Sequence, residues 1–226
     1  MKFNRPFYFI LLMTIVHLSA KAQFMDSLRT SIHKKPTFFF SFDSHTSFIS
    51  NNEADIWGFV FGVTFNNKIN IGGGFNTLST PFYKNKVVVT DAKTDSIISE
   101  QLSFNYWTYY LEYIFYNTKH WQFSFPLEIG LGTSQYQYNY GGKLFSDNPH
   151  LIIPIEPAFS ITYQFNKWIG FGTEIGYRFM LVNNNNIKQN FNSPTYNLGL
   201  QIYIIEIYKS IFPHSKITRK LNGYSD

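Results

Sequence analysis

Large apolar residues alternate with small or polar residues along most of this chain. Between residues 121 and 132, the odd positions are all bulky and apolar: Trp121, Phe123, Phe125, Leu127, Ile129 and Leu131. The even positions are small, polar or charged: Gln122, Ser124, Pro126, Glu128, Gly130 and Gly132. Two residues is the period of a β-strand, whose successive side chains point to opposite faces. The sequence therefore predicts a strand with one bulky apolar face and one small polar face.

The same alternation recurs in other segments, which polar connections separate. Eight strands are predicted, near residues 37–44, 55–65, 69–82, 106–116, 121–132, 151–165, 168–181 and 195–208. The connections alternate between short turns (66–68, 117–120 and 166–167) and long polar segments (45–54, 83–100, 141–150 and 182–194). Short turns at one end and long loops at the other are typical of outer-membrane barrels. We therefore predict an all-β fold, a closed antiparallel up-and-down transmembrane β-barrel, over residues 37–208.

Residues 86–100 allow a second strand count. This segment (KVVVTDAKTDSIISE) contains two short β-prone runs. We interpret the runs as continuations of the third and fourth strands, which project beyond the membrane as a hairpin. Counting them as membrane strands would give ten strands, but they lack the apolar length of the others. Eight strands is therefore the prediction, and ten is the alternative.

The volume of the side chains indicates which face points outward. Eight strands enclose an interior just wide enough for side chains or one small ligand. The chain contains 25 Phe, 16 Tyr and 4 Trp, and these rings cannot all fit inside such a barrel. A soluble, lipocalin-like barrel would need them inside, so we predict that the bulky face contacts lipid. Four residues are then expected in the interfacial aromatic girdles: Trp57, Trp107, Trp121 and Trp168.

The N-terminus has the parts of a secretory signal peptide. Lys2 and Arg5 precede an apolar run over residues 7–18, and Ala20 and Ala22 form a small-x-small cleavage site. We predict a cleaved signal peptide at 1–22, a mature start at Gln23, a periplasmic lead-in at 23–36 and a periplasmic tail at 209–226. The predicted location is the outer membrane of a Gram-negative bacterium, with both termini in the periplasm.

Charge and composition narrow the function classes. Three of the 19 Lys and Arg residues lie in 1–22, which contains no acid, so the rest carries 16 basic against 14 acidic residues. A near-neutral mature chain without a basic block gives no indication of nucleic-acid binding. The chain has no Cys, which excludes disulfides, thiolate sites and a lipidated N-terminal cysteine.

The small face of the predicted strands carries a set of ionisable residues. They are Asp43, Glu112, Glu128, Glu156, Glu174 and Arg178. Buried charges need partners or hydrogen bonds, and one Arg cannot pair with five acids. The first interpretation is a hydrogen-bonded polar filling of the barrel, with neighbours such as Tyr106 and Tyr110. A narrow cation-favouring path and a catalytic carboxylate are the alternatives.

The sequence offers little further evidence of catalysis. The His residues are scattered over predicted loops, turns and the tail, and none has metal-ligand spacing. We predict no catalytic residue, no metal and no cofactor. His45 beside Ser44 or Ser47 is the single pair that favours a lipid-modifying enzyme, because such enzymes combine a hydroxyl or water with a His near one rim.

Several segments resemble small outer-membrane β-barrel proteins of the Bacteroidota. They are residues 35–40 (KPTFFF), 43–50 (DSHTSFIS), 110–115 (YLEYIF), 121–130 (WQFSFPLEIG) and 155–157 (IEP), behind a leader that ends in Ala-Gln. The resemblance implies a membrane barrel and no site residues, because the family is largely uncharacterised. Some relatives of this type serve secretion machinery, which implies a role as an accessory subunit as an alternative.

Taken together, these features predict a structural, adhesive or binding barrel with a filled polar interior, working through its external loops. The alternatives are an accessory subunit of a secretion or envelope complex, a narrow cation-favouring channel and a lipid-modifying enzyme. The expected partners are outer-membrane lipid, the barrel-assembly machinery during insertion and other envelope proteins. No nucleic-acid partner is expected.

Overall fold

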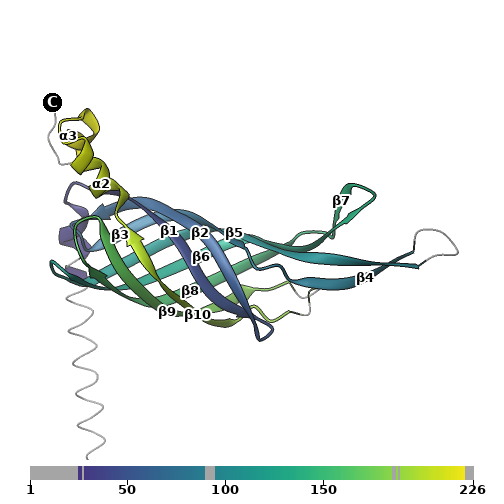
Figure 1. Ribbon diagram of the computed structural model, residues 1–226. Coiled ribbons are helices and arrows are strands. Elements are labelled where there is room, and N and C mark those ends of the chain that lie inside the picture. The colour runs from purple at the N-terminus through teal and green to yellow at the C-terminus, as the bar shows by residue number, and fades with distance from the viewer. Residues whose placement is uncertain (1–24, 27, 90–94, 185–186, 188, 222–226) are drawn as a thin grey trace, which may run out of the picture.

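The computed structural model describes residues 25–26, 28–89, 95–184, 187 and 189–221 (Figure 1). The predicted signal peptide and the cleavage site before Gln23 lie outside these residues. Residues 28–32 of the predicted lead-in are helical. The strands that follow are β1 (Thr37–Ile49), β2 (Asn52–Phe65), β3 (Ile69–Leu78), β4 (Tyr83–Val89), β5 (Asp95–Asn117), β6 (Trp121–Tyr140), β7 (Lys143–Ser146), β8 (His150–Gln164), β9 (Ile169–Val182) and β10 (Ser193–Ile202). Two helices, α2 (Ile204–Ile211) and α3 (Lys216–Leu221), come after the last strand.

Eight of these strands form a closed antiparallel ring. Starting from β1, the ring runs through β2, β3, β5, β6, β8, β9 and β10. The β5–β6 pairing and the β1–β10 pairing, in which Thr46 lies opposite Tyr196, complete the ring. The structure therefore confirms the predicted eight-stranded up-and-down barrel. The ten-stranded alternative is wrong, because β4 and β7 lie outside the ring.

β4 and β7 extend the barrel wall at one end. β5 and β6 are 23 and 20 residues long, and their far ends pair with β4 and β7. Figure 1 shows these four segments projecting well beyond the other strands. The hairpin predicted from residues 86–100 is thus present, although the strand breaks between Leu78 and Tyr83. At this break, Ser79 N donates to the carbonyl oxygen of Asp55 at 2.9 Å.

The connection between β1 and β2 differs from the prediction of a long loop at 45–54. Both strands continue to a two-residue turn at Ser50 and Asn51, whose φ angles are +49° and +67°. Positive φ at both central residues is typical of the type I′ hairpin turn, which fits the twist of paired strands. The polarity of residues 45–54 therefore marks the end of a hairpin, and His45 lies on a strand.

The two faces of the wall have the predicted orientation. Bulky side chains on the outer face are exposed, among them Phe38, Phe42, Trp57, Trp107, Ile175 and Leu198. Small residues let the strands approach on the inner face. Gly62 lies opposite Gly72, and a Cβ on Gly62 would come within 2.2 Å of the Ile71 carbonyl oxygen.

The last predicted strand ends earlier than expected. Residues 195–208 were predicted as a strand, but β10 ends at Ile202 and residues 204–211 form α2. Ile204, Ile207, Tyr208 and Ile211 follow helical spacing, which explains why the alternation is lost there. α2 and α3 lie at the end of the barrel opposite the projecting strands (Figure 1). Neither they nor the other described helical residues are long and apolar enough to cross a membrane as a helix.

Candidate functional site

An apolar cluster fills the barrel interior at the end that carries the projecting strands. It consists of Ile49, Ala54, Ile56, Leu102, Phe104, Tyr106, Tyr136, Ile152, Ile187 and Phe191. Phe104 on β5 stacks on Phe191 with their ring centroids 4.8 Å apart. Ile187 and Phe191 belong to the connection between β9 and β10, which therefore folds back into the mouth of the barrel.

This mouth corrects two sequence predictions. The connection 182–194, predicted as a long polar loop, has two apolar side chains, Ile187 and Phe191, buried in the mouth, and Asn184 Nδ2 donates to the Ser134 carbonyl oxygen at 3.0 Å. The inner face was also predicted to consist mainly of small and polar residues, whereas the bulky Phe104 and Tyr136 point inward here. The β9–β10 connection supplies Ile187 and Phe191, and burial against these apolar side chains makes bulky inner residues favourable.

Arg178 is the centre of the charged layer below this cluster. Its side chain is fully buried on β9, and Nε donates to Glu156 Oε1 at 3.0 Å while Nη2 donates to Glu156 Oε2 at 3.3 Å. Nη1 donates to Ser47 Oγ at 3.0 Å. Tyr106 Oη donates to Glu156 Oε1 at 2.7 Å. A bidentate Arg–carboxylate pair with further hydrogen bonds is the arrangement that can offset burial of both charges.

His45 is a member of this layer that the sequence prediction missed. It was expected in an external loop, but it lies on the inner face of β1 and is 8% exposed. Its Nε2 lies 3.0 Å from Arg178 Nη2, and its Nδ1 lies 3.4 Å from Asp43 Oδ1. Its Nε2 also lies 3.3 Å from Glu156 Oε2, so the ring is placed between the carboxylates of Asp43 and Glu156. Extending the period-two pattern of β1 from Asp43 would have placed His45 inside.

The hydroxyl groups proposed to act with His45 do not assemble a catalytic pair. Ser44 is the neighbour of His45 on a strand, so it lies on the opposite face and is exposed. Ser47 shares the inner face with His45, but its hydroxyl accepts the hydrogen bond from Arg178 and donates to the Ala54 carbonyl oxygen. The interior position of His45 also separates it from the lipid-facing wall.

The other predicted interior acids lie on β5, β6 and β9. Glu112 accepts hydrogen bonds from Asn70 and from the Tyr110 hydroxyl. Glu128 accepts a hydrogen bond from Asn76 Nδ2 at 3.1 Å. Glu174 lies on β9 opposite Ser160 of β8. Within the described residues, no three His, Asp or Glu side chains are placed to hold a metal ion.

The four Trp residues all lie on the outer face and are between 41% and 61% exposed. Trp121 begins β6 and Trp168 directly precedes β9, so both lie at the end with the short turns. Trp168 Nε1 donates to Ser210 Oγ of α2 at 3.0 Å. Trp57 and Trp107 lie within β2 and β5. The interfacial girdles of Trp57, Trp107, Trp121 and Trp168 stay a prediction.

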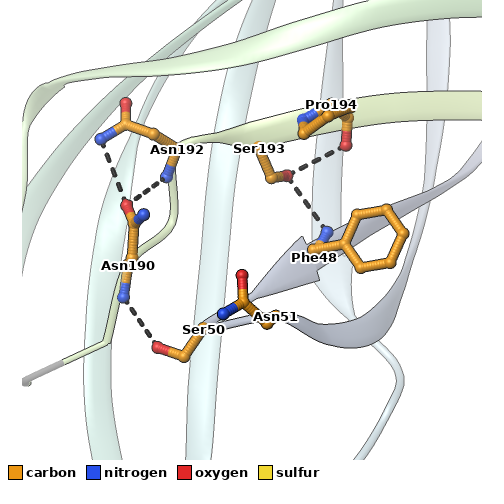
Figure 2. A pocket seen from close by; sticks show the side chains of 7 residues that line it. All are labelled: Phe48, Ser50, Asn51, Asn190, Asn192, Ser193 and Pro194. Carbon is orange, nitrogen blue, oxygen red and sulfur yellow. Dashed lines mark hydrogen bonds between the residues drawn. The ribbon is translucent and has the colours of Figure 1, made fainter.

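A surface pocket of about 310 Å³ lies at the rim of the barrel, beside the β1–β2 turn. Its walls are Phe48, Ser50, Asn51, Asn190, Asn192, Ser193 and Pro194 (Figure 2). These residues come from the β1–β2 hairpin, from the connection that enters the mouth and from the start of β10. We call this the rim pocket.

Several hydrogen bonds hold the walls of the rim pocket together. Ser50 N donates to the Asn190 carbonyl oxygen at 3.0 Å, and Asn190 N donates to Ser50 Oγ at 2.9 Å. Phe48 N donates to Ser193 Oγ at 3.1 Å (Figure 2). The turn and the connection are thus linked in both directions, which gives the rim pocket a defined shape.

The projecting strands carry an ion-pair cluster of their own. Lys86 Nζ on β4 lies 2.6 Å from Asp147 Oδ1, 3.4 Å from Glu100 Oε2 and 5.0 Å from the centre of the Tyr138 ring. The hydrogen bond to Asp147 raises the pKa of the Lys86 ammonium above its ordinary value. This cluster joins β4 to the segment after β7 by side-chain contacts.

Comparisons with known proteins give structural likenesses at low identity. No family model matches the chain, and no curated protein matches it. Neisserial surface protein A is 10% identical, with 74% of this chain and 96% of that chain covered and a TM-score of 0.49. The outer membrane protein OprG from Pseudomonas aeruginosa is 14% identical, with 75% and 96% covered and a TM-score of 0.44. The attachment invasion locus protein Ail of Yersinia pestis, solved with the heparin analogue sucrose octasulfate, is 11% identical, with 74% and 98% covered and a TM-score of 0.44.

These three proteins come from Neisseria, Pseudomonas and Yersinia, so they do not bear out the resemblance to the Bacteroidota, which stays a prediction. The low identity transfers neither a ligand nor a site residue to this chain. The positions of His45, Arg178 and the rim pocket therefore have to be interpreted from their own geometry.

Proposed function

We propose that this chain is an integral outer-membrane barrel whose interior is closed and whose external end binds a ligand. The observation that carries the proposal is the contrast between the two faces of the ring. The outer face exposes bulky apolar side chains on strand after strand, whereas the inner face is filled by the Arg178 layer and the apolar mouth. A soluble protein rarely exposes so large an apolar surface.

The length of the exposed apolar belt supports a membrane location. On β6, Trp121, Phe125, Ile129 and Leu131 are exposed and apolar, and the next exposed outer residue is the polar Thr133. The belt therefore spans residues 121–131. A tilted transmembrane strand needs about 9–11 residues to cross the hydrocarbon core. The remaining length of β6 then extends outside the membrane, together with β4, β7 and the part of β5 that pairs with β4.

The packing of the interior favours a barrel that does not conduct over the cation-channel alternative. Arg178, Tyr106, Phe104 and Phe191 are all essentially inaccessible to solvent. They close the cylinder at two successive levels, the charged layer and the mouth. With the interior occupied, the external rim and the projecting strands remain as the surfaces available for binding.

The test combines location, folding and conductance. The full chain, expressed in a Gram-negative host, should fractionate with the outer membrane and should migrate faster on gels before boiling than after boiling. Planar bilayers containing the purified barrel should show no steady conductance. A soluble periplasmic product would contradict the location, and a steady cation current that falls with Glu128→Gln and Glu156→Gln would contradict the closed interior.

The same proposal includes the orientation of the chain. With the short turns in the periplasm, both termini lie there, and the projecting strands lie outside the cell. An epitope inserted between Gly141 and Gly142 should then be stained on intact cells, whereas one fused after residue 226 should be stained only after permeabilisation. The reverse staining pattern would contradict this orientation.

The projecting strands favour a second candidate function, that of an accessory subunit in an envelope complex. In the sheet order, β4 and β7 are terminal strands, so each offers an edge to which another chain could add a strand. All four side chains of β7 are exposed. Gentle detergent extraction should then co-purify an envelope protein, and Leu144→Pro on β7 should abolish this co-purification without changing heat-modifiability. A barrel that purifies alone would exclude this candidate.

A further inference from the structure

We propose that the rim pocket binds an uncharged saccharide. This inference rests on the proposed function, because it names the ligand class and the site through which the external end acts. The pocket volume of about 310 Å³ lies at the lower end of the range for ligand pockets, roughly 300–1,000 Å³. The site is therefore of a size for a small ligand such as a terminal sugar unit.

The charge of the lining selects against anions. None of the seven lining residues is ionisable. The nearby carboxylate of Glu53 accepts a hydrogen bond from the Tyr196 hydroxyl at 2.7 Å, so the charge closest to the pocket along the hairpin is negative. A phosphate or sulfate group would lack the Arg or Lys partners that such groups use. A neutral ligand needs no such cationic partner.

The polar groups suit a ligand rich in hydroxyls. A hydroxyl donates and accepts at once, and a carboxamide offers both an acceptor oxygen and two donor hydrogens. No hydrogen bond engages the Asn51 carboxamide within the described part of the chain, and this exposed side chain borders the pocket. Asn190 Oδ1 accepts two hydrogen bonds from Asn192, which leaves Asn190 Nδ2 as a donor toward the pocket.

Apolar surface complements these polar groups. Phe48 and Pro194 also line the pocket. Sugars present a face of C–H groups as well as a rim of hydroxyls, so a site that combines an aromatic ring with carboxamides matches both parts of the molecule. Five of the seven lining residues are polar, so the rim pocket is more polar than a usual ligand pocket, which fits a ligand rich in hydroxyls.

The pocket is held in one shape before any ligand arrives. Met180 N donates to Asn192 Oδ1 at 2.7 Å, and Phe191, between Asn190 and Asn192, is buried against Phe104. The connection is therefore anchored on both sides of the pocket. Since little ordering is left to occur on binding, a small set of hydrogen bonds can yield measurable affinity.

The Asn51→Gly variant tests the site with little disturbance to the fold. Asn51 has a φ of +67°, which glycine adopts without strain, so the turn is kept while the carboxamide is removed. The matched control is Asn67→Gly, which makes the same change at a φ of +52° in the β2–β3 turn, at the other end of the barrel. The Phe48→Leu variant tests the ring separately.

The experiment uses the full-length protein extracted from the outer membrane into nanodiscs. Saturation-transfer NMR is recorded with glucose, galactose and N-acetylglucosamine, and with glucose 6-phosphate as the charged counterpart of glucose. We expect at least one neutral sugar to bind with a dissociation constant on the order of millimolar. Asn51→Gly should weaken it about fivefold or more, as expected for one lost hydrogen bond, and Asn67→Gly should not change it. Phe48→Leu should also weaken binding.

Four results would overturn the inference: no binding of any neutral sugar, tighter binding of glucose 6-phosphate than of glucose, equal binding by Asn51→Gly and the unchanged protein, or unchanged binding by Phe48→Leu. Heat-modifiability of the same nanodisc sample separates this failure from failure of the proposed function. A heat-modifiable outer-membrane barrel without sugar binding removes only the saccharide site. A chain that does not fractionate with the outer membrane and is not heat-modifiable removes the proposed function itself.

Discussion

The charged layer around Arg178 and the apolar mouth around Phe104 fill the same cylinder by different means. In the charged layer, Arg178, Glu156 and Ser47 come from strands of the ring and hold one another by hydrogen bonds. In the mouth, Phe104 stacks on Phe191, and Phe191 belongs to the β9–β10 connection, which lies outside the ring of strands. The wall thus specifies the charged layer by itself, whereas the mouth depends on a loop that has to dock.

The largest expected effect comes from breaking the charged layer. Arg178→Met leaves the Glu156 carboxylate buried without its cation, which should lower the free energy of unfolding by about 3–5 kcal/mol. The double variant Arg178→Met/Glu156→Leu should recover most of this loss, because neither charge is then buried. Urea unfolding in lipid vesicles, followed by Trp fluorescence, measures both. A double variant as unstable as the single one would show that the pair itself stabilises the fold.

The second expected effect compares the inside of the wall with its outside. Ile175 is 67% exposed on the outer face of β9, directly after Glu174 on the inner face. Ile175→Lys should lower the free energy of unfolding by about 2–4 kcal/mol, as expected for Lys at the membrane midplane. Glu174→Leu should lower the free energy of unfolding by less than Ile175→Lys does. The same vesicle assay measures both, and a larger loss for Glu174→Leu would contradict the assignment of the faces.

A smaller effect is expected in the mouth. Phe191→Ala removes an apolar contact, but the loop can leave the barrel and avoid an internal cavity. The free energy of unfolding should therefore fall by about 1.5–3 kcal/mol, the transfer contribution alone. Limited proteolysis should cut the connection 183–192 faster in this variant, while Arg178→Met should leave the cleavage rate of folded barrels unchanged. Equal protection in both variants would mean that the loop is held by its polar contacts.

The smallest effect is expected outside the ring. Lys86→Met removes an ion pair that is partly exposed, so the free energy of unfolding should change by about 0–1 kcal/mol. The folded pKa of Lys86 is raised, so its contribution is complete below the ordinary pKa of Lys and is lost as the pH rises through the folded value. Unfolding of the unchanged protein and the variant at pH 8 and above pH ~11 measures this difference, which should vanish at the higher pH.

The sequence predicts those parts of the molecule that period two governs. Alternation in residues 121–132 and 168–181 places Glu128, Glu174 and Arg178 inside the ring, and the structure agrees. The same rule, continued past Ser44, would also have placed His45 inside. The polar composition around Ser50 and Asn51 led to the prediction of a long loop. The structure has a two-residue turn instead, which the positive φ angles of Ser50 and Asn51 make possible. Composition alone does not reveal such φ angles.

The mouth and the rim pocket could not be predicted in this way. Phe191 reaches Phe104 across 87 positions of the chain, and no local pattern encodes such a contact. The rim pocket needs Asn51 and Asn190 to meet, which follows only once the loop has docked. The end of β10 shows a related limit, because residues 204–211 are apolar enough for either a strand or a helix and only their spacing separates the two.

The meeting of β1 and β10 has a consequence for how this protein is made. β1 pairs with β2 on one side, and it gains its second neighbour, β10, only when the last strand has been synthesised, since Thr46 lies opposite Tyr196. Pairing across so long a stretch of chain is slow to form, so both outermost strands wait with open edges until then. A chain that stops after Val182 has no partner for Thr46, and its first strand would be free to recruit a strand from another molecule.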